Sequence, residues 1–194
     1  NNIGNIYGST GKYKKALSYF EQALSISTEI GDKAGTVIRY GNIADSYANL
    51  NQLPRALEYL QKALNLSLEL NVLDWIAFYK NELATALVIL GRFDKAIVLA
   101  QEAINVAQKA NNISYKINGL TTQALAYLKK GELQKAMKLS RGAINELEKL
   151  PVIEGHKSDI YYTHFKILKA MNRTHDANKF HEKACRDIKK RGER

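Results

Sequence analysis

The sequence predicts an all-α fold, a solenoid of about five antiparallel helix pairs. Alanine recurs along the chain at intervals of 40 or 41 residues, and a glycine or asparagine precedes each of these alanines by five positions. A constant period of this length is typical of stacked helical repeats. The chain also holds only 12 Gly and 2 Pro in 194 residues, too few for the many turns of an all-β fold.

The recurring positions describe one helix-turn-helix unit. Two alanines lie seven residues apart on one face of its second helix, where a small side chain lets neighbouring helices approach closely; they are Ala16/Ala23, Ala56/Ala63, Ala96/Ala103, Ala136/Ala143 and Ala177/Ala184. Glycine and asparagine tolerate the left-handed backbone that ends a helix. The first helices are therefore expected to end at Gly11, Asn51, Gly91, Gly131 and Asn172.

The repeat pattern predicts the bounds of each helix along the chain. First helices are expected to end near residues 10, 50, 90, 130 and 171, and the last four to begin near 33, 73, 113 and 156. Second helices are expected over 13–30, 53–70, 93–110, 133–149 and 174–190. Asp32, Asp74 and Ser114 are candidate N-caps for the first helices. Pro151 is expected to close the fourth second helix.

Composition and charge narrow the class of protein. Hydrophobic residues make up 45% of the chain and charged residues 25%, as in ordinary globular proteins. No apolar run approaches the roughly 20 residues of a membrane span, and no secretory signal is present. Cys185 is the one cysteine, which excludes an internal disulfide framework and fits a reducing, cytoplasmic location.

The repeat resembles the tetratricopeptide repeat (TPR) family in its 40-residue form. The first unit carries the family pattern at Ile3, Gly4, Tyr7, Gly11, Ala16, Phe20 and Ala23, and the second at Ile43, Ala44, Tyr47, Ala56, Leu60 and Ala63. The resemblance implies a right-handed superhelical solenoid, a single TPR domain over residues 1–190. Its repeats would span 1–31 (truncated at its start), 32–71, 72–111, 112–151 and 152–190, with a polar tail at 191–194.

Units four and five depart from the family pattern. Gln123 and His164 stand where the family has a large apolar residue, and Ser140 and His181 stand where it has an aromatic one. Cys185 occupies the place of Leu24 and Leu64, so it is expected to face the core as a small hydrophobic residue.

No motif indicates an enzyme. The chain has no glycine-rich phosphate loop, no zinc-protease helix motif and no nucleophile elbow, so we expect no catalytic residues and no cofactor. The four histidines, His156, His164, His175 and His181, lack the spacing of metal ligands, and no metal site is expected.

The resemblance instead implies a concave groove, lined by the first helices, that binds a peptide, a helix or a partner domain. The implied groove residues are Asn5, Asn42, Asp45, Asn49, Trp75, Phe78, Asn81, Glu82, Thr85, Asn118, Thr122, Lys129 and Lys166. Asparagine suits this role because its amide both donates and accepts hydrogen bonds. Trp75, Phe78 and Glu82 share one helix face, which predicts an anchor pocket or, alternatively, packing of Trp75 against the preceding helix.

The sequence is also compatible with other functions. The family's clamp for a C-terminal carboxylate is not expected, because Asn1, Phe78 and Glu82 stand where its cationic residues belong. Residues 98–194 carry net charge +9 against +1 for residues 1–97, so nucleic-acid or polyanion binding by the basic half is the alternative function. Self-association through the truncated N-terminal edge is a further hypothesis.

Overall fold

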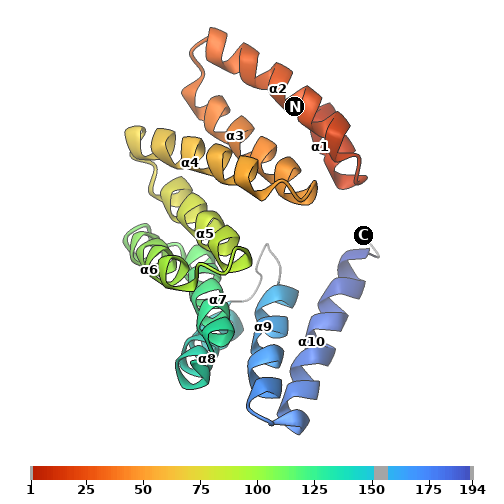
Figure 1. Cartoon of the computed structure of the whole chain (residues 1–194), viewed down its shortest axis with the longest axis vertical. Helices are drawn as coiled ribbons and strands as arrows, with labels where there is room; N and C mark the ends of the chain where they lie inside the picture. Colours follow the sequence, from red (N-terminus) through yellow and green to blue (C-terminus); the bar gives the residue numbers. More distant parts are fainter. Residues whose placement is uncertain (1, 151–156, 193–194) are drawn as a thin grey trace. The chain divides into compact units, whose positions relative to one another are not determined.

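A computed structural model describes residues 2–150 and 157–192, and this part of the chain is all α-helix and turn (Figure 1). The helices are α1 (Asn2–Ser9), α2 (Tyr13–Glu29), α3 (Lys33–Asn49), α4 (Leu53–Glu69), α5 (Leu73–Ile89), α6 (Phe93–Lys109), α7 (Ile113–Lys130), α8 (Leu133–Glu148), α9 (Lys157–Ala170) and α10 (Thr174–Gly192). Every predicted helix is confirmed within about two residues. The predicted break at Pro151 lies outside the described residues.

The chain forms two compact units, residues 1–86 and residues 87–194, and α5 runs from the first into the second. In the first unit α1 packs on α2, α2 on α3, and α3 on α4. In the second unit α7 packs between α6 and α8, and α9 packs against α8 and α10. Short turns make consecutive helices antiparallel, as Figure 1 shows for α9 and α10. The handedness of the winding stays a prediction.

The repeated alanines form the helix contacts, as predicted. Nine of the ten are buried, with at most 3% of the residue exposed, and Ala23 is half-buried. In the first unit Ala16 and Ala56 pack with Phe20, Ile43 and Tyr47. Larger apolar residues fill the space that the small ones leave, which is how such repeats share one continuous core.

The helix ends follow the predicted turn chemistry. Gly11, Gly91 and Gly131 have φ between 72° and 82°, and Asn51 and Asn172 have φ near 58°. The turns between repeats also contain a left-handed residue, at Gly31, Asn71 and Asn111, which the sequence did not lead us to predict. The first three repeats therefore contain two left-handed residues each rather than one.

Two of the three predicted N-caps are wrong. Asp32 does cap α3, and its carboxylate accepts a hydrogen bond from Gly35 N at 2.8 Å. Asp74 and Ser114 instead lie inside the first turns of their helices, because those helices begin one residue earlier. Asn112 caps α7 by accepting from Tyr115 N at 3.0 Å.

Three of the four unusual residues of units four and five form buried polar contacts, and the fourth, His181, is exposed. Ser140 Oγ lies 2.8 Å from His164 Nδ1, and both residues are at least 96% buried. Burial, with Arg141 and Arg173 nearby, lowers the pKa of His164 to about 4. Gln123 Nε2 donates to the Ile97 carbonyl oxygen at 3.2 Å. These polar side chains replace apolar ones without leaving hydrogen-bonding groups unsatisfied.

The core position predicted for Cys185 is wrong, because its side chain is exposed. The matching residues Leu64, Ile104 and Ile144 are buried. The described residues contain no helix after α10 that would cover this face. Cys185 Sγ lies 3.9 Å from His181 Nε2, one turn away on the same helix.

Candidate functional site

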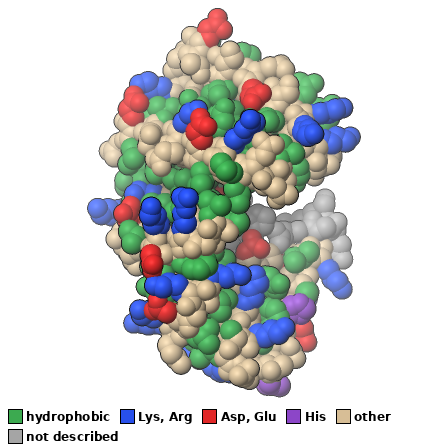
Figure 2. Space-filling model, in the orientation of Figure 1, with side chains coloured by type: hydrophobic (Ala, Val, Ile, Leu, Met, Phe, Trp, Pro, Cys, Tyr) green, Lys and Arg blue, Asp and Glu red, His purple; other side chains and the backbone are tan. Residues whose placement is uncertain are grey.

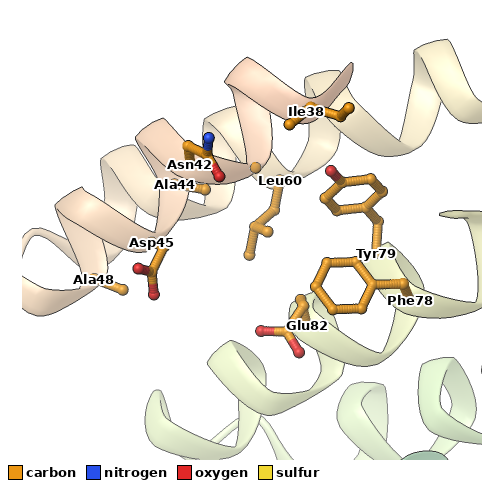
Figure 3. A pocket seen from close by; sticks show the side chains of 10 residues that line it. Ile38, Asn42, Ala44, Asp45, Ala48, Leu60, Phe78, Tyr79 and Glu82 are labelled. Atoms are coloured by element: carbon orange, nitrogen blue, oxygen red, sulfur yellow. The ribbon is translucent and has the colours of Figure 1, made fainter. Parts of the chain in front are cut away.

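A pocket opens between α3 and α5 in the first unit (Figure 3). Its volume is about 320 Å³. The residues that line it are Ile38, Gly41, Asn42, Ala44, Asp45 and Ala48 from α3, Leu60 from α4, and Phe78, Tyr79 and Glu82 from α5. Four of the predicted groove residues therefore meet in one place: Asn42, Asp45, Phe78 and Glu82.

Helical spacing explains how α3 presents this wall. Ile38, Asn42, Asp45 and Ala48 recur every three or four residues, so they follow one stripe of the helix. The opposite stripe of α3 carries Thr36, Ile43 and Tyr47, which are buried. The α3 stripe is thus free of core packing, which leaves its side chains to line the pocket.

The close approach of α3 and α5 depends on a glycine facing a tyrosine. Tyr79 is 5% exposed, and its hydroxyl donates to the Val37 carbonyl oxygen at 3.1 Å. A Cβ atom on Gly41 would lie 2.6 Å from the Tyr79 hydroxyl oxygen. Gly41 therefore gives Tyr79 the space to form one wall of the pocket, with the Phe78 ring edge-on beside it at 5.0 Å between centroids.

Two carboxyl groups occupy the other end of the pocket. Figure 3 shows Asp45 of α3 and Glu82 of α5 on facing sides, away from Ile38 and Tyr79. Burial, reinforced by the charge of Asp45, raises the pKa of Glu82 to about 7. Partial desolvation also raises the pKa of Asp45, although the residue is exposed and Asn49 Nδ2 donates to its carboxylate at 3.1 Å. Within the described residues, Glu82 has no hydrogen-bond donor or cation as a partner.

The remaining predicted groove residues of the first unit lie outside the pocket lining. Asn5 and Asn49 are exposed, and Trp75 is half-buried. Asn81 is 8% exposed, and its Oδ1 atom has no hydrogen-bond partner within the described part of the chain. Thr85 Oγ1 donates to the Asn81 carbonyl oxygen at 3.0 Å. Of the three predicted anchor residues, Phe78 and Glu82 line the pocket and Trp75 does not, and their role as an anchor stays a prediction.

The predicted groove residues of the second unit have different environments. Asn118 and Lys129 are exposed, and Thr122 is 7% exposed. Lys166 is half-buried, with its ammonium 4.2 Å from the centroid of the Tyr162 ring. Burial and the charge of Lys129 lower the pKa of Lys166. The positive charges of Lys129 and Lys166 therefore repel each other.

Sequence reasoning missed several pocket residues. Gly41, Ala44, Ala48, Leu60 and Tyr79 were not among the predicted site residues, although they line the cavity. Gly41 and Ala48 follow the three- and four-residue spacing that starts at Ile38, so this spacing could have found them. Tyr79 could not be found this way, because its place depends on how α5 packs against α3.

The basic residues that support polyanion binding are partly neutralised. Lys130 forms ion pairs with Asp94 at 2.6 Å and Glu132 at 3.2 Å, and Lys135 pairs with Glu132 at 2.6 Å. Figure 2 shows acidic and apolar side chains interspersed with basic ones on the face it presents. Surface pairs like these add little stability, but they reduce the local positive potential.

Neither a cluster of metal ligands nor a membrane-spanning helix occurs among the described residues. No three histidine, cysteine or acidic side chains there gather closely enough to hold a metal ion. No helix there combines the length and apolar character that crossing a membrane requires.

Comparison with known families decides the class of this repeat. Tetratricopeptide repeats match residues 1–69 and residues 79–114, together more than half of the chain. The chain belongs to the tetratricopeptide repeat family. The TPR matches include α3 and α4 and most of α5, the helices that form the pocket. No curated protein sequence matches the chain.

Solved TPR-like structures share this fold at low identity. BtubC (BKLC) from P. vanneervenii has a TM-score of 0.78 at 20% identity, over 98% of this chain and 78% of that one. The Rap conjugation gene regulator of plasmid pLS20, in complex with the Phr* peptide, has a TM-score of 0.82 at 18% identity. The match covers 96% of this chain but 52% of the regulator. Aspartyl phosphate phosphatase F from Bacillus subtilis scores 0.80 at 18% identity, with 98% and 50% covered. These likenesses confirm an all-α helical-repeat solenoid.

Proposed function

We propose that this TPR chain is a non-enzymatic module that binds a peptide or a segment of a partner protein, with the α3–α5 pocket as its main anchor site. The observation that carries the proposal is the pocket itself. It combines aromatic and aliphatic walls with an amide and two carboxyl groups, the mixture that orients a bound side chain in known ligand sites. Its volume of about 320 Å³ lies within the usual range for such sites.

The fold and its relatives support a protein ligand. TPR chains form interaction scaffolds, and one structure of the same fold, the pLS20 Rap regulator, contains a bound peptide. Around the pocket, the half-buried amide of Asn42 offers donors and an acceptor for a peptide backbone. The exposed Asn49 offers its amide oxygen as an acceptor, because its amide nitrogen donates to Asp45. Asn5, Asn118, Thr122, Lys129 and Lys166 extend the proposed contact surface on their own units.

A peptide-binding measurement tests the proposal. A library of random peptides is panned against the purified chain, and the affinity of a selected peptide is measured by calorimetry. Phe78→Ala should weaken binding at least about tenfold, because it removes an aromatic wall from the pocket. Asn42→Ala should weaken it less, through the loss of a polar contact.

The control is Asn65→Ala, which removes the same amide from an exposed position on α4, outside the pocket. It should leave the affinity unchanged. If the library yields no binder, or if Phe78→Ala and Asn65→Ala bind alike, the pocket is not the anchor site.

Three further features belong to this proposal. The chain carries out no reaction and needs no cofactor. Its cytoplasmic location accords with the single, exposed Cys185. It also self-associates through α1, whose Ile3 and Ile6 are 53% and 61% exposed one turn apart.

Nucleic-acid binding is the second candidate function, supported by the net charge of +9 in residues 98–194. A polyanion complex releases counterions, so its affinity falls steeply with salt concentration. Peptide binding in the pocket involves few charges and should show a shallow salt dependence. A steep slope with a single-stranded oligonucleotide, together with no library peptide bound, would reverse the order of the two candidates.

A further inference from the structure

Among the described residues, no lysine, arginine or histidine side chain lines the acidic end of the pocket. Asp45 and Glu82 approach from two different helices, and none of the ten residues that line the pocket is lysine, arginine or histidine. Asn49 is the one hydrogen-bond donor to either carboxyl group within the described residues. A pair of carboxyl groups placed in this way disfavours its own ionisation, which indicates that a positive charge from outside would be accommodated there.

The other walls of the pocket limit the kind of cation. Ile38 and Leu60 supply aliphatic surface, and Phe78 and Tyr79 supply aromatic surface (Figure 3). Apolar walls of this kind do not favour a hydrated divalent ion, because such an ion binds oxygen ligands and retains water molecules. A cation carried on an apolar stem fits both parts of the pocket, the stem against the aliphatic wall and the charge beside the carboxyl groups.

Arginine satisfies this geometry better than lysine does. Its planar guanidinium has five donors in a fixed fork, which can reach carboxyl groups on two separate helices. The same plane stacks on aromatic rings, and Phe78 lies on α5 one turn before Glu82. A lysine ammonium could pair with one carboxyl group but would not use the ring in the same way.

We propose that the pocket between α3 and α5 receives an arginine side chain of the bound peptide, held by the carboxyl groups of Asp45 and Glu82 against the Phe78 ring. This assignment rests on the proposed function and names the ligand chemistry of that site. It also defines what the site rejects, since an acidic side chain would meet two like charges.

The test pairs a peptide change with a protein change. A peptide selected from the random library is resynthesised with each arginine replaced in turn by citrulline, which keeps the shape but loses the charge. One replacement should weaken binding to the wild-type chain at least about tenfold. Glu82→Gln should weaken binding of the arginine peptide by a similar factor and leave the affinity for the citrulline peptide unchanged. Such non-additive effects are expected when the two changed groups contact each other directly.

A matched variant controls for the loss of a carboxylate charge elsewhere on the protein. Glu58→Gln makes the same change at an exposed site on α4, outside the pocket, and should bind both peptides like the wild type. Circular dichroism of Glu82→Gln confirms that the variant is folded before affinities are compared. Asp45→Asn provides a second, independent pocket variant with the same expected coupling.

The outcomes separate the two proposals. If peptides bind and Phe78→Ala abolishes binding, but no arginine replacement couples to Glu82 or Asp45, the arginine assignment is overturned and the peptide-binding function stands. If no library peptide binds at all, the proposed function fails and the assignment fails with it. Equal affinities for arginine and glutamate peptides would also overturn the assignment.

Discussion

At the residue scale, Glu82 is the side chain whose state most affects the pocket. A carboxyl group that loses water and faces another acid is more stable when protonated. Its pKa of about 7 lies well above the ordinary 4.5, so its charge changes near neutral pH. Asp45 is the one charged group that contributes to this shift, and its own pKa is also raised.

Glu82→Gln should stabilise the chain at pH 8 and leave its stability nearly unchanged at pH 4. The folded state keeps a proton on Glu82 between pH 4.5 and about 7 that the unfolded state releases. Stability is therefore lost as pH rises through this window, and the loss is complete above it. We expect a gain of about 1–3 kcal/mol at pH 8 in denaturant unfolding, allowing for partial exposure of the side chain.

The control for this measurement is Glu29→Gln at the exposed end of α2, which should show no such pH-dependent gain. If Glu82→Gln destabilises the chain more at pH 8 than at pH 4, the ionised carboxylate has a stabilising partner and the raised pKa is wrong.

At the element scale, the pocket exists because α3 and α5 approach closely at one glycine. A side chain at Gly41 would displace the Tyr79 hydroxyl, which would then lose its hydrogen bond to Val37. A packed interior of this kind does not absorb an added methyl group without a shift of its neighbours. The same helix surface therefore determines both the stability of the first unit and the shape of the pocket.

Gly41→Ala should lower the free energy of unfolding by about 1–3 kcal/mol, the usual cost of overpacking. Gly142→Ala is the matched change on α8, where no atom lies within 4 Å of the added Cβ. It should raise stability by about 0.5–1 kcal/mol, because alanine is the better helix former. Thermal unfolding of the two variants measures the contrast; similar shifts would show that Tyr79 moves aside at little cost.

At the scale of the whole molecule, the exposed apolar face of α1 is the surface through which we expect the chain to self-associate. Ile3 and Ile6 lie one turn apart with more than half of each residue exposed. Apolar side chains that share a helix face in this way are favourable sites of contact with another copy.

We expect the purified chain to show a molar mass above the monomer value of 21.8 kDa at high protein concentration, measured by size-exclusion chromatography with light scattering. Ile6→Asp should restore the monomer mass, because a charge in an apolar interface is costly. Ile188→Asp is the control on α10, where the isoleucine is 57% exposed. A monomer at every concentration would leave α1 without a role in assembly.

The sequence alone determined the repeat and its helices. Helix ends were predictable at Gly91 and Asn51 because a left-handed backbone is a local property that few residues tolerate. The buried alanines were predictable because their spacing repeats with the helical period. The N-cap at Asp32 was predicted correctly, because capping also depends on local backbone geometry. The N-cap at Ser114 was predicted wrongly, because α7 begins at Ile113 and its cap is Asn112.

The tertiary structure decided what the surface of those helices does. The sequence indicated Asn42, Asp45, Phe78 and Glu82 as groove residues, but their meeting in one pocket depends on the packing of α3 against α5. Cys185 shows the converse, since its position in the repeat is apolar while its exposure depends on what packs over α10. Helix formation follows from local backbone preferences and periodicity, whereas a pocket and the altered pKa values inside it come from side chains that only the folded chain brings together.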